Sequence, residues 1–337
     1  MILSKTSEQS LGLSVPTDKI DEYALLSQIA DMYYNQNLKV TEIAAKLFFS
    51  PAKISRLLSQ AREKKVVEIN VKRVAGRLTD LEDHLKKDFS LKDAIVINSF
   101  QNETDIEELD ILTDFASKYT SGLLNGKKIL GISNGTAVNM VVSKIQPLYR
   151  CELDIVQIIG SGGGANKDIE SRDLVNKMAN IYPGGRTYFL NTPLYIDSAA
   201  AKEGLMKDAS ISNALSMMKN CDILLSGVGT FHKDPSLIPE VMKEYLSPSH
   251  IQELHEKNAI GCVCAQFYDI QGNLIDCTWN HHCMSMSFED IKKNSMTIAI
   301  ATGMSKVLPI LGALRAGLID VLITGSQVAS KLCHSDL

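Results

Sequence analysis

The chain has 337 residues, a net charge of −4 and 45% hydrophobic residues, so it can form about two folded domains. This composition excludes a disordered chain, a collagen-like chain and a disulfide scaffold, and no apolar run approaches the roughly 18 residues of a membrane-spanning helix. Because the N-terminus lacks a signal-peptide pattern and the seven cysteines contain no CxxC pair, we expect a cytoplasmic protein with reduced thiols and no membrane partner.

The charge is distributed unevenly along the chain. Residues 39–73 contain nine basic and three acidic side chains, a local net charge of +6, which leaves −10 for the rest of the protein. A basic segment joined to an acidic body indicates that one end of the protein binds a polyanion. On charge alone, a basic helix that is merely a solvated face remains an alternative.

Three helices are predicted after a polar tail of residues 1–20. Apolar side chains at three-to-four-residue spacing from Asp21 predict the first helix. Thr41 is the predicted N-cap of the second helix, and Ser50 that of the third, with Pro51 at its first position. The third helix has one apolar stripe, which leaves its other face for DNA. The candidate DNA-binding residues on this helix and at its ends are Ser50, Lys53, Ser55, Arg56, Ser59, Gln60, Arg62 and Lys64.

Two short helices, a tight turn and a helix with an exposed basic face are typical of a helix-turn-helix domain, whose last helix enters the major groove. The turn position that usually holds glycine is Phe48 here. A left-handed backbone at this bulky residue costs about 1 kcal/mol. The alternative for this segment is a helical module that only dimerises.

Residues 77–89 carry an apolar seam and are predicted to form a linker helix, which either pairs with a second copy or packs on its own chain. From Asp93 onward, short apolar strands alternate with helices. This pattern predicts a doubly wound, largely parallel α/β domain. The predicted strands are 94–97, 128–132, 154–159, 187–190, 222–225, 260–267, 296–301 and 319–324, and the predicted helices are 105–124, 136–145, 171–182, 209–219 and 306–316. The expected organisation is a flexible tail (1–20), a helix-turn-helix domain (21–75), a linker helix (76–90) and an effector-binding and oligomerisation domain (91–337).

Glycines and small polar residues follow four of the predicted strands. The carboxyl ends of parallel strands meet at one edge of a sheet, so these loops can form a ring that holds an anion through backbone N–H groups and helix N-termini. One such loop alone is explained by turn geometry, whereas their recurrence favours a binding site. The candidate effector-binding residues in these loops are Ser133, Asn134, Gly135, Thr136, Gly160, Ser161, Gly162, Gly163, Gly227, Gly229, Thr230 and Lys306.

The stretch YYNQNLKVTEIAAKLFFSPAKISRLLSQAREKKVVEINV, followed by LEDHLKKDFSLKDAIVI, resembles the N-terminal part of the SorC-type (sugar-binding domain) family of bacterial transcription regulators. The resemblance implies a helix-turn-helix, a linking segment and an effector domain related to sugar-phosphate isomerases. It implies that Thr136 and Lys306 contact an effector phosphate, and it adds Asp269, which lies in a family turn. Cys262 and Gly325 stand where members commonly carry Asp, so the effector is expected to differ from a typical family sugar phosphate.

No catalytic residue, metal site or cofactor is predicted. Cys277, His281, His282 and Cys283 are close in sequence, but on an extended chain adjacent side chains point to opposite sides. Lys306 could act as an acid or base in an isomerase-like fold, yet no carboxylate falls in the strand-end loops beside it.

We therefore expect an effector-responsive transcription regulator rather than an enzyme. The expected activity is repression of a carbohydrate operon through operator DNA, bound as a homodimer or homotetramer and released by a phosphorylated sugar or polyol. The alternatives are a sugar-phosphate isomerase-like enzyme and a sugar-binding protein that does not bind DNA.

Overall fold

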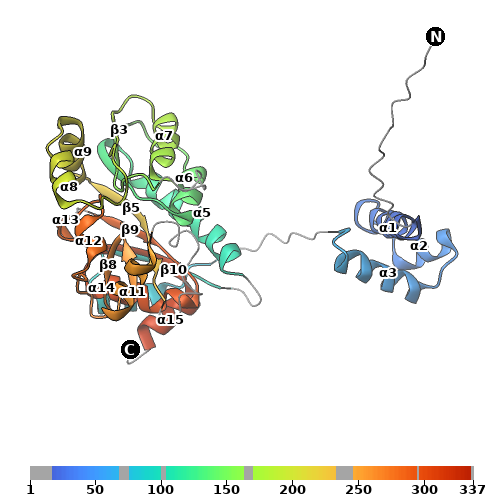
Figure 1. The fold of residues 1–337 in the computed structure, drawn as a ribbon. Coiled ribbons are helices and arrows are strands. Elements are labelled where there is room, and N and C mark those ends of the chain that lie inside the picture. Colours follow the sequence, from blue (N-terminus) through green and yellow to red (C-terminus); the bar gives the residue numbers. More distant parts are fainter. Residues whose placement is uncertain are drawn as a thin grey trace, which may run out of the picture. The chain divides into compact units, whose positions relative to one another are not determined.

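The computed structural model of the chain contains two compact units, Met1–Val74 and Ala75–Leu337. It describes residues 17–67, 76–99, 104–162, 170–232, 246–293 and 296–334. Figure 1 shows the fold of each unit. None of the described helices combines the length and hydrophobicity that a membrane span requires.

The first unit is a small helical domain with its own core. Its helices are α1 (Thr17–Ala30), the π-helical turn η1 (Asp31–Asn35), α2 (Val40–Leu47) and α3 (Pro51–Glu63). Ile29, Ile43, Ile54 and Leu58 are buried together where the helices cross. Helix α1 begins before the predicted start at Asp21, and the part of the predicted tail up to residue 16 lies outside the described residues.

Helix α3 begins where the sequence predicts. The Oγ atom of Ser50 accepts a hydrogen bond from the backbone N–H of Lys53 at 3.2 Å, and Pro51 occupies the first helical position. Phe48 ends α2 in the left-handed conformation, with φ 57°. The turn therefore has the geometry that the sequence predicts, with a phenylalanine where glycine would be unstrained.

Two other predictions for this unit are wrong in detail. Helix α2 begins at Val40 rather than after a Thr41 cap, because the Glu42 carboxylate accepts the backbone N–H of Lys39 at 2.7 Å and so satisfies the helix start. The sequence also predicts a short strand over residues 66–71, after the third helix. Val66 and Val67 form a bend instead, and residues 68–71 lie outside the described residues.

The second unit is built on a seven-stranded parallel sheet, which confirms the prediction of a doubly wound, largely parallel α/β domain. The strand order is β1-β10-β9-β5-β2-β3-β4. These strands are β1 (Asp93–Ile97), β2 (Gly126–Ile132), β3 (Cys151–Gln157), β4 (Thr187–Tyr188), β5 (Ile223–Gly227), β9 (Thr297–Ile300) and β10 (Val321–Gly325). Alternate side chains enter two separate buried clusters, with Ile95 and Ile323 on one face and Val96 and Leu322 on the other.

Helices cover both faces of this sheet (Figure 1). The face of Ile95 packs against α5 (Asp105–Leu123), α6 (Thr136–Lys144) and α7 (Ser171–Ile181). The face of Val96 packs against α4 (Thr79–Phe89), α9 (Ala209–Lys219), α14 (Val307–Arg315) and α15 (Ser326–His334). The sequence pattern does not predict α15, nor the further helices α8 (Ala199–Met206), α11 (Pro248–Glu256), α12 (Thr278–His282) and α13 (Phe288–Lys293).

The prediction of one strand over residues 260–267 is wrong. The segment forms an antiparallel hairpin in a second, three-stranded sheet made of β6 (Gly229–Thr230), β7 (Gly261–Val263) and β8 (Gln266–Tyr268). Its two turn residues, Cys264 and Ala265, have φ values of 49° and 63°. Such a turn usually carries Asn or Gly, so its usual sequence signal is absent.

The linker helix α4 packs on its own chain, which decides between the two alternatives for its apolar seam. Leu85 is fully buried in the core on the Val96 face of the sheet, and Leu81 packs against that core. Glu82 is 2% exposed and accepts two hydrogen bonds of 2.8 Å from Arg77 and one of 2.9 Å from the backbone N–H of Val96. The hydrogen bond to Glu82 raises the pKa of Arg77. This buried carboxylate therefore fixes the linker helix to the first strand of the sheet.

Replacing Glu82 with glutamine should lower the free energy of unfolding by about 1.5–3 kcal/mol, the range for a hydrogen bond to a charged group. The amide oxygen of glutamine can accept a hydrogen bond from Val96 or from Arg77, but the side chain lacks the negative charge that strengthens the bonds to both. Chemical denaturation measures the change. Asp83→Asn on the exposed side of the same helix is the control, with an expected change within about 0.5 kcal/mol. Equal stability of the two variants would contradict the anchoring role of Glu82.

Candidate functional site

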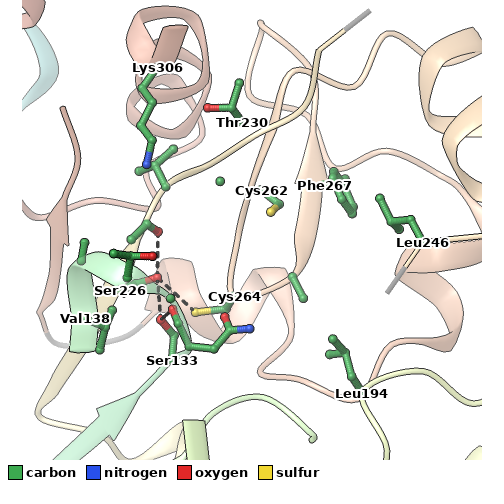
Figure 2. Close-up of a pocket in the computed structure, with 18 of the residues that line it drawn as sticks. Ser133, Val138, Leu194, Ser226, Thr230, Leu246, Cys262, Cys264, Phe267 and Lys306 are labelled. Carbon is green, nitrogen blue, oxygen red and sulfur yellow. Dashed lines mark hydrogen bonds between the residues drawn. The ribbon is translucent and has the colours of Figure 1, made fainter. Parts of the chain in front are cut away.

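A pocket lies at the carboxyl edge of the large sheet, where β2 and β5 are neighbours. After β2 the chain continues to β3, on one side of the β2–β5 pair. After β5 it forms the strands of the second sheet and then continues to β9, on the other side of the pair. Such a change of direction leaves a crevice outside the strand ends. Here it holds a cavity of about 280 Å³ (Figure 2). The predicted effector-binding residues that line this cavity are Ser133, Asn134, Gly135, Thr136, Gly227, Gly229, Thr230, Cys262 and Lys306.

The described part of the glycine loop after β3, residues 160–162, does not line the cavity. Its backbone is already used: Gly160 donates to the carbonyl of Met284 at 2.8 Å, and Ser161 donates to that of Thr192 at 2.9 Å. The N–H of Gly162 faces the Glu170 carboxylate at 3.4 Å. The predicted Gly163 lies outside the described residues.

Asp269 also lies outside the cavity lining. It follows β8, and its carboxylate accepts the backbone N–H of Asn273 at 2.8 Å and the side-chain amide of the same residue at 3.1 Å. These bonds close a tight turn, and Gly272 in that turn has φ 85°. Asp269 therefore acts in turn formation, which explains the motif around it without an effector.

Lys306 supplies the charge of the pocket. It ends the short helix η4 (Met304–Lys306), immediately before α14, and its Nζ atom points toward the cavity (Figure 2). Among the described lining residues it is the only charged one. Burial lowers the pKa of Lys306, against smaller opposing effects of Cys262 and Asp105. An anion bound beside the ammonium group would stabilise its charged form.

Thr230 and the start of α6 line the same cavity as Lys306. The hydroxyl of Thr230 is buried and has no hydrogen-bond partner in the part of the chain that the structure describes. Figure 2 shows it on the side of the pocket where Lys306 enters. Helix α6 begins at Thr136, and the residues of its first turn, Thr136 to Val138, line the pocket. The N–H groups of a first helical turn have no partner within the helix, so they can bind a ligand there. An ammonium, a hydroxyl and a helix N-terminus together suit a phosphate or carboxylate.

The opposite wall of the pocket is apolar and contains residues that the sequence analysis does not select. They are Leu194, Leu246, Phe267 and Trp279. The indole N–H of Trp279 donates to the carbonyl of Ala265 at 2.9 Å, which fixes its ring against the β7–β8 turn. These side chains come from a loop, a hairpin and a short helix distant in sequence. No local spacing relates them, so only the tertiary fold could reveal this wall.

Glu108 occupies the space left by Gly325. A Cβ atom at position 325 would collide with the Glu108 carboxylate, which accepts hydrogen bonds from the hydroxyls of Ser99 and Thr302. Glu108 belongs to α5 and not to the strand end where Gly325 lies. The carboxylate expected at position 325 is thus replaced by one from a neighbouring element, at the same edge of the sheet.

The Cys277–Cys283 segment is not extended as predicted, because residues 278–282 form the helix α12. His281 pairs with Asp276 at 2.6 Å, and His282 contacts the carbonyl of Ile196 at 2.6 Å. No group of three potential metal ligands gathers within the described ranges.

The predicted DNA-binding residues divide by what their side chains already contact. Ser55 and Arg56 are exposed on α3, whereas Ser59 and Gln60 are partly buried. Ser59 donates to the carbonyl of Ser55 at 3.2 Å and accepts from Arg62 at 3.3 Å. Arg56 has no described partner for its guanidinium, which leaves it available for a ligand.

Three other candidates on α3 and its ends are engaged within their own unit. The Ser50 hydroxyl is used as the N-cap. The ammonium of Lys53 lies 3.7 Å from the centre of the Phe49 ring. Lys64 forms a 2.6 Å ion pair with Glu22 of α1, so much of its charge is neutralised locally.

Comparison with known proteins identifies the larger unit. The family described as "Putative sugar-binding domain" matches residues 74–334. The sorbitol operon regulator of Klebsiella pneumoniae is 28% identical over 317 residues, covering 93% of this chain and 98% of the relative. The deoxyribonucleoside regulator of Bacillus subtilis (strain 168) is 27% identical over 315 residues, with the same coverage of both chains.

Solved structures agree with these relatives. The crystal structure of the full-length sorbitol operon regulator SorC from Klebsiella pneumoniae superposes with a TM-score of 0.69 at 26% identity, covering 93% of this chain and 99% of that one. A DeoR family transcriptional regulator from Listeria monocytogenes gives a TM-score of 0.68 at 26% identity, covering 75% of this chain and 98% of that one. The similarity to SorC thus spans both units.

Anion binding at Lys306 should weaken as the pH rises. Because burial lowers the pKa of Lys306, its ammonium loses a proton at a lower pH than an exposed lysine. The affinity for inorganic sulfate should therefore already fall between neutral pH and about pH 10.4, the ordinary pKa of lysine. Calorimetric titration over this range measures the effect.

The matched variants are Lys306→Met in the pocket and Lys331→Met on the exposed side of α15. The first should weaken sulfate binding by about 1.5–3 kcal/mol and remove its pH dependence, whereas the second should leave both unchanged. A pH profile that survives in Lys306→Met would exclude Lys306 as the titrating group.

Proposed function

The chain belongs to the sugar-binding-domain family of SorC-type transcriptional regulators, and from that premise we propose how its two units act. It is an effector-responsive transcriptional regulator and not an enzyme, with DNA as one partner and a sugar-related compound as the other. We place its DNA site on α3 and its effector site in the pocket at the ends of β2 and β5. We assign these sites to a helix-turn-helix domain of residues 21–75 and an effector domain of residues 91–337, joined by a linker over residues 76–90, in a protein of the cytoplasm.

The exposed face of α3 supports the DNA site. Its guanidinium and hydroxyl groups match the donors that read base edges and phosphates in the major groove. Arg56, which has no described partner, is the strongest candidate for base contact, with Lys53, Ser55 and Gln60 beside it. Arg62 is the candidate for phosphate contact. Lys64 is a weaker one, because Glu22 already holds its charge.

The anion site at Lys306 supports a phosphorylated effector. The observation that carries this proposal is an ammonium group that points into a pocket beside a threonine hydroxyl with no hydrogen-bond partner among the described residues. Two relatives are named for sorbitol and for deoxyribonucleosides, compounds whose phosphorylated derivatives carry one strong anionic group. We infer that a phosphorylated sugar or polyol binds here and releases the protein from an operator, so that the protein represses a carbohydrate operon.

A homodimer or homotetramer is the expected DNA-binding form. One recognition helix covers few base pairs, and two copies at half-sites about one helical turn apart bind far more selectively. The seam of α4 is used within its own chain, so another surface must hold the copies together.

A two-part assay tests the proposed function. DNA duplexes selected by the protein from a random-sequence pool should bind with an affinity that falls steeply with salt, and a phosphorylated sugar or polyol should release them. Salt-independent DNA binding would contradict the DNA site. Release by the unphosphorylated compounds alone would contradict the anion site.

Arg56→Ala should abolish binding to the selected duplex, while sulfate binding in the effector pocket stays unchanged. Arg62→Ala should weaken binding to all DNA sequences and reduce the salt slope by about one, whereas Lys64→Ala should have a smaller effect because of its ion pair with Glu22. Fluorescence anisotropy at several salt concentrations measures each change. Lys219→Ala, on the surface of α9, is the control; equal losses in all four variants would indicate nonspecific charge attraction.

A further inference from the structure

The effector pocket has two chemically different sides, and this inference rests on its proposed effector function. Lys306 and Thr230 lie on one side, and Leu194, Leu246 and Phe267 lie on the other (Figure 2). Trp279 packs edge-on against Phe267, with ring centres 6.2 Å apart, and extends the apolar wall. A ligand that places its anionic group at Lys306 therefore has its remaining atoms against apolar surface.

The polar groups between the two sides are engaged with one another. The Ser133 hydroxyl donates to that of Ser226 at 3.3 Å, and Ser226 donates to the carbonyl of Gly227 at 3.0 Å. The Cys264 thiol lies 3.7 Å from the Ser226 hydroxyl. Each of these serine hydroxyls already uses its one proton within the protein, so ligand hydroxyls find few free hydrogen-bond donors in the described middle of the pocket, apart from Asn134 and backbone groups.

Cys262 removes a further partner for ligand hydroxyls. Burial raises its pKa to about 12, so the thiol is neutral and a weak hydrogen-bond acceptor. A carboxylate at this position would accept two or more ligand hydroxyls, whereas a neutral thiol offers an apolar contact. A hydroxyl buried without a partner lowers affinity by about tenfold.

We propose that the effector is a phosphorylated sugar with a hydroxyl-poor body, such as a deoxy sugar phosphate, rather than a fully hydroxylated sugar or polyol phosphate. Its phosphate binds at Lys306, Thr230 and the start of α6. Its deoxygenated carbons contact Cys262 and the wall of Phe267 and Trp279. The cavity of about 280 Å³ suits a ligand of this size.

Calorimetric titration of the full chain with 2-deoxyribose 5-phosphate, ribose 5-phosphate and sorbitol 6-phosphate tests the proposal. The deoxy compound should bind at least about tenfold more tightly than either of the others, because it buries fewer unpartnered hydroxyls. Equal or tighter binding of ribose 5-phosphate or sorbitol 6-phosphate overturns the inference and leaves the proposed function standing. If none of the three binds and inorganic phosphate does not bind either, the anion site and this inference both fall.

A matched pair of variants locates the preference. Cys262→Asp should reduce the ratio of affinities for deoxyribose and ribose 5-phosphates at least about fivefold, because the carboxylate accepts the extra hydroxyl. Cys262→Ser, which adds a smaller polar group, should reduce it less and serves if the aspartate variant does not fold. Cys333→Ser in α15, outside the described pocket lining, should leave the ratio unchanged. A ratio that does not change in either folded Cys262 variant contradicts the role of Cys262.

A second inference comes independently from Phe48 in the first unit. Its side chain is 94% exposed, although its backbone is left-handed with φ 57°. Both features are unfavourable in the isolated chain, because a bulky side chain strains this conformation and an exposed ring gains no burial. Glycine would avoid both costs.

The surroundings of Phe48 indicate what its ring contacts. It lies in the turn between α2 and α3, two residues before the Ser50 cap of the recognition helix. Lys46 and Lys53 are exposed near the same turn. An anionic partner is therefore favoured here, and the start of the recognition helix is the part of a helix-turn-helix that enters the DNA groove.

We infer that Phe48 contacts DNA directly, with its ring against a sugar or the methyl group of a thymine beside the groove. Phe48→Gly should raise or maintain the thermal midpoint of the chain while weakening binding to the selected duplex about tenfold. A tenfold loss corresponds to roughly 55 Å² of apolar surface that is no longer buried against DNA.

Tyr33→Ala, which removes another exposed aromatic ring from the same unit, is the control and should leave DNA affinity unchanged. Unchanged affinity in Phe48→Gly overturns the inference. A change in oligomeric state of the free protein, measured by sedimentation, also overturns it, because the ring would then contact a second copy. If Phe48→Gly is less stable than the parent, Phe48→Asn, which tolerates the left-handed conformation, provides the same comparison.

Discussion

The parallel pairing of β2 with β5 is the constraint on which the effector pocket depends. Parallel strands bring their carboxyl ends to one edge, so the loop that holds Ser133 and the strand end that holds Ser226 meet there and their hydroxyls bond at 3.3 Å. Strand β9, the next neighbour of β5, delivers Lys306 to the same edge. Since the chain turns in opposite directions after β2 and β5, a crevice is left outside their carboxyl ends.

A protein that is acidic outside its basic N-terminal segment must attract an anion by local means. We propose that the pocket does this with one ammonium group, one hydroxyl that has no hydrogen-bond partner among the described residues, and the first turn of α6. Burial lowers the pKa of Lys306, because the charged ammonium is less stable in the buried site than in water. A bound anion would stabilise the ammonium and offset this loss. The sign of the net charge therefore says little about this site, whereas the placement of a single side chain explains it.

The sequence predicted the anion side of the pocket more fully than the apolar side. Thr136 begins α6 and Gly227 ends β5, and the local hydrophobic periodicity of the sequence predicts where these elements begin and end. Trp279 has no such signal, because it reaches the pocket through a hydrogen bond to Ala265 in the turn of a hairpin that lacks Asn and Gly. Conversely, Gly160 had the expected signal, but its backbone N–H is bonded to Met284.

By itself, the sequence determined the alternation of strands and helices, the capped recognition helix and the left-handed turn at Phe48, because these depend on side chains within a few residues of one another. Only the tertiary structure decided which groups remain free. Glu82 buries the linker helix on β1, Glu22 neutralises Lys64, and Glu108 fills the space beside Gly325. Each of these contacts joins residues far enough apart in the chain that their meeting depends on packing, which local periodicity does not encode.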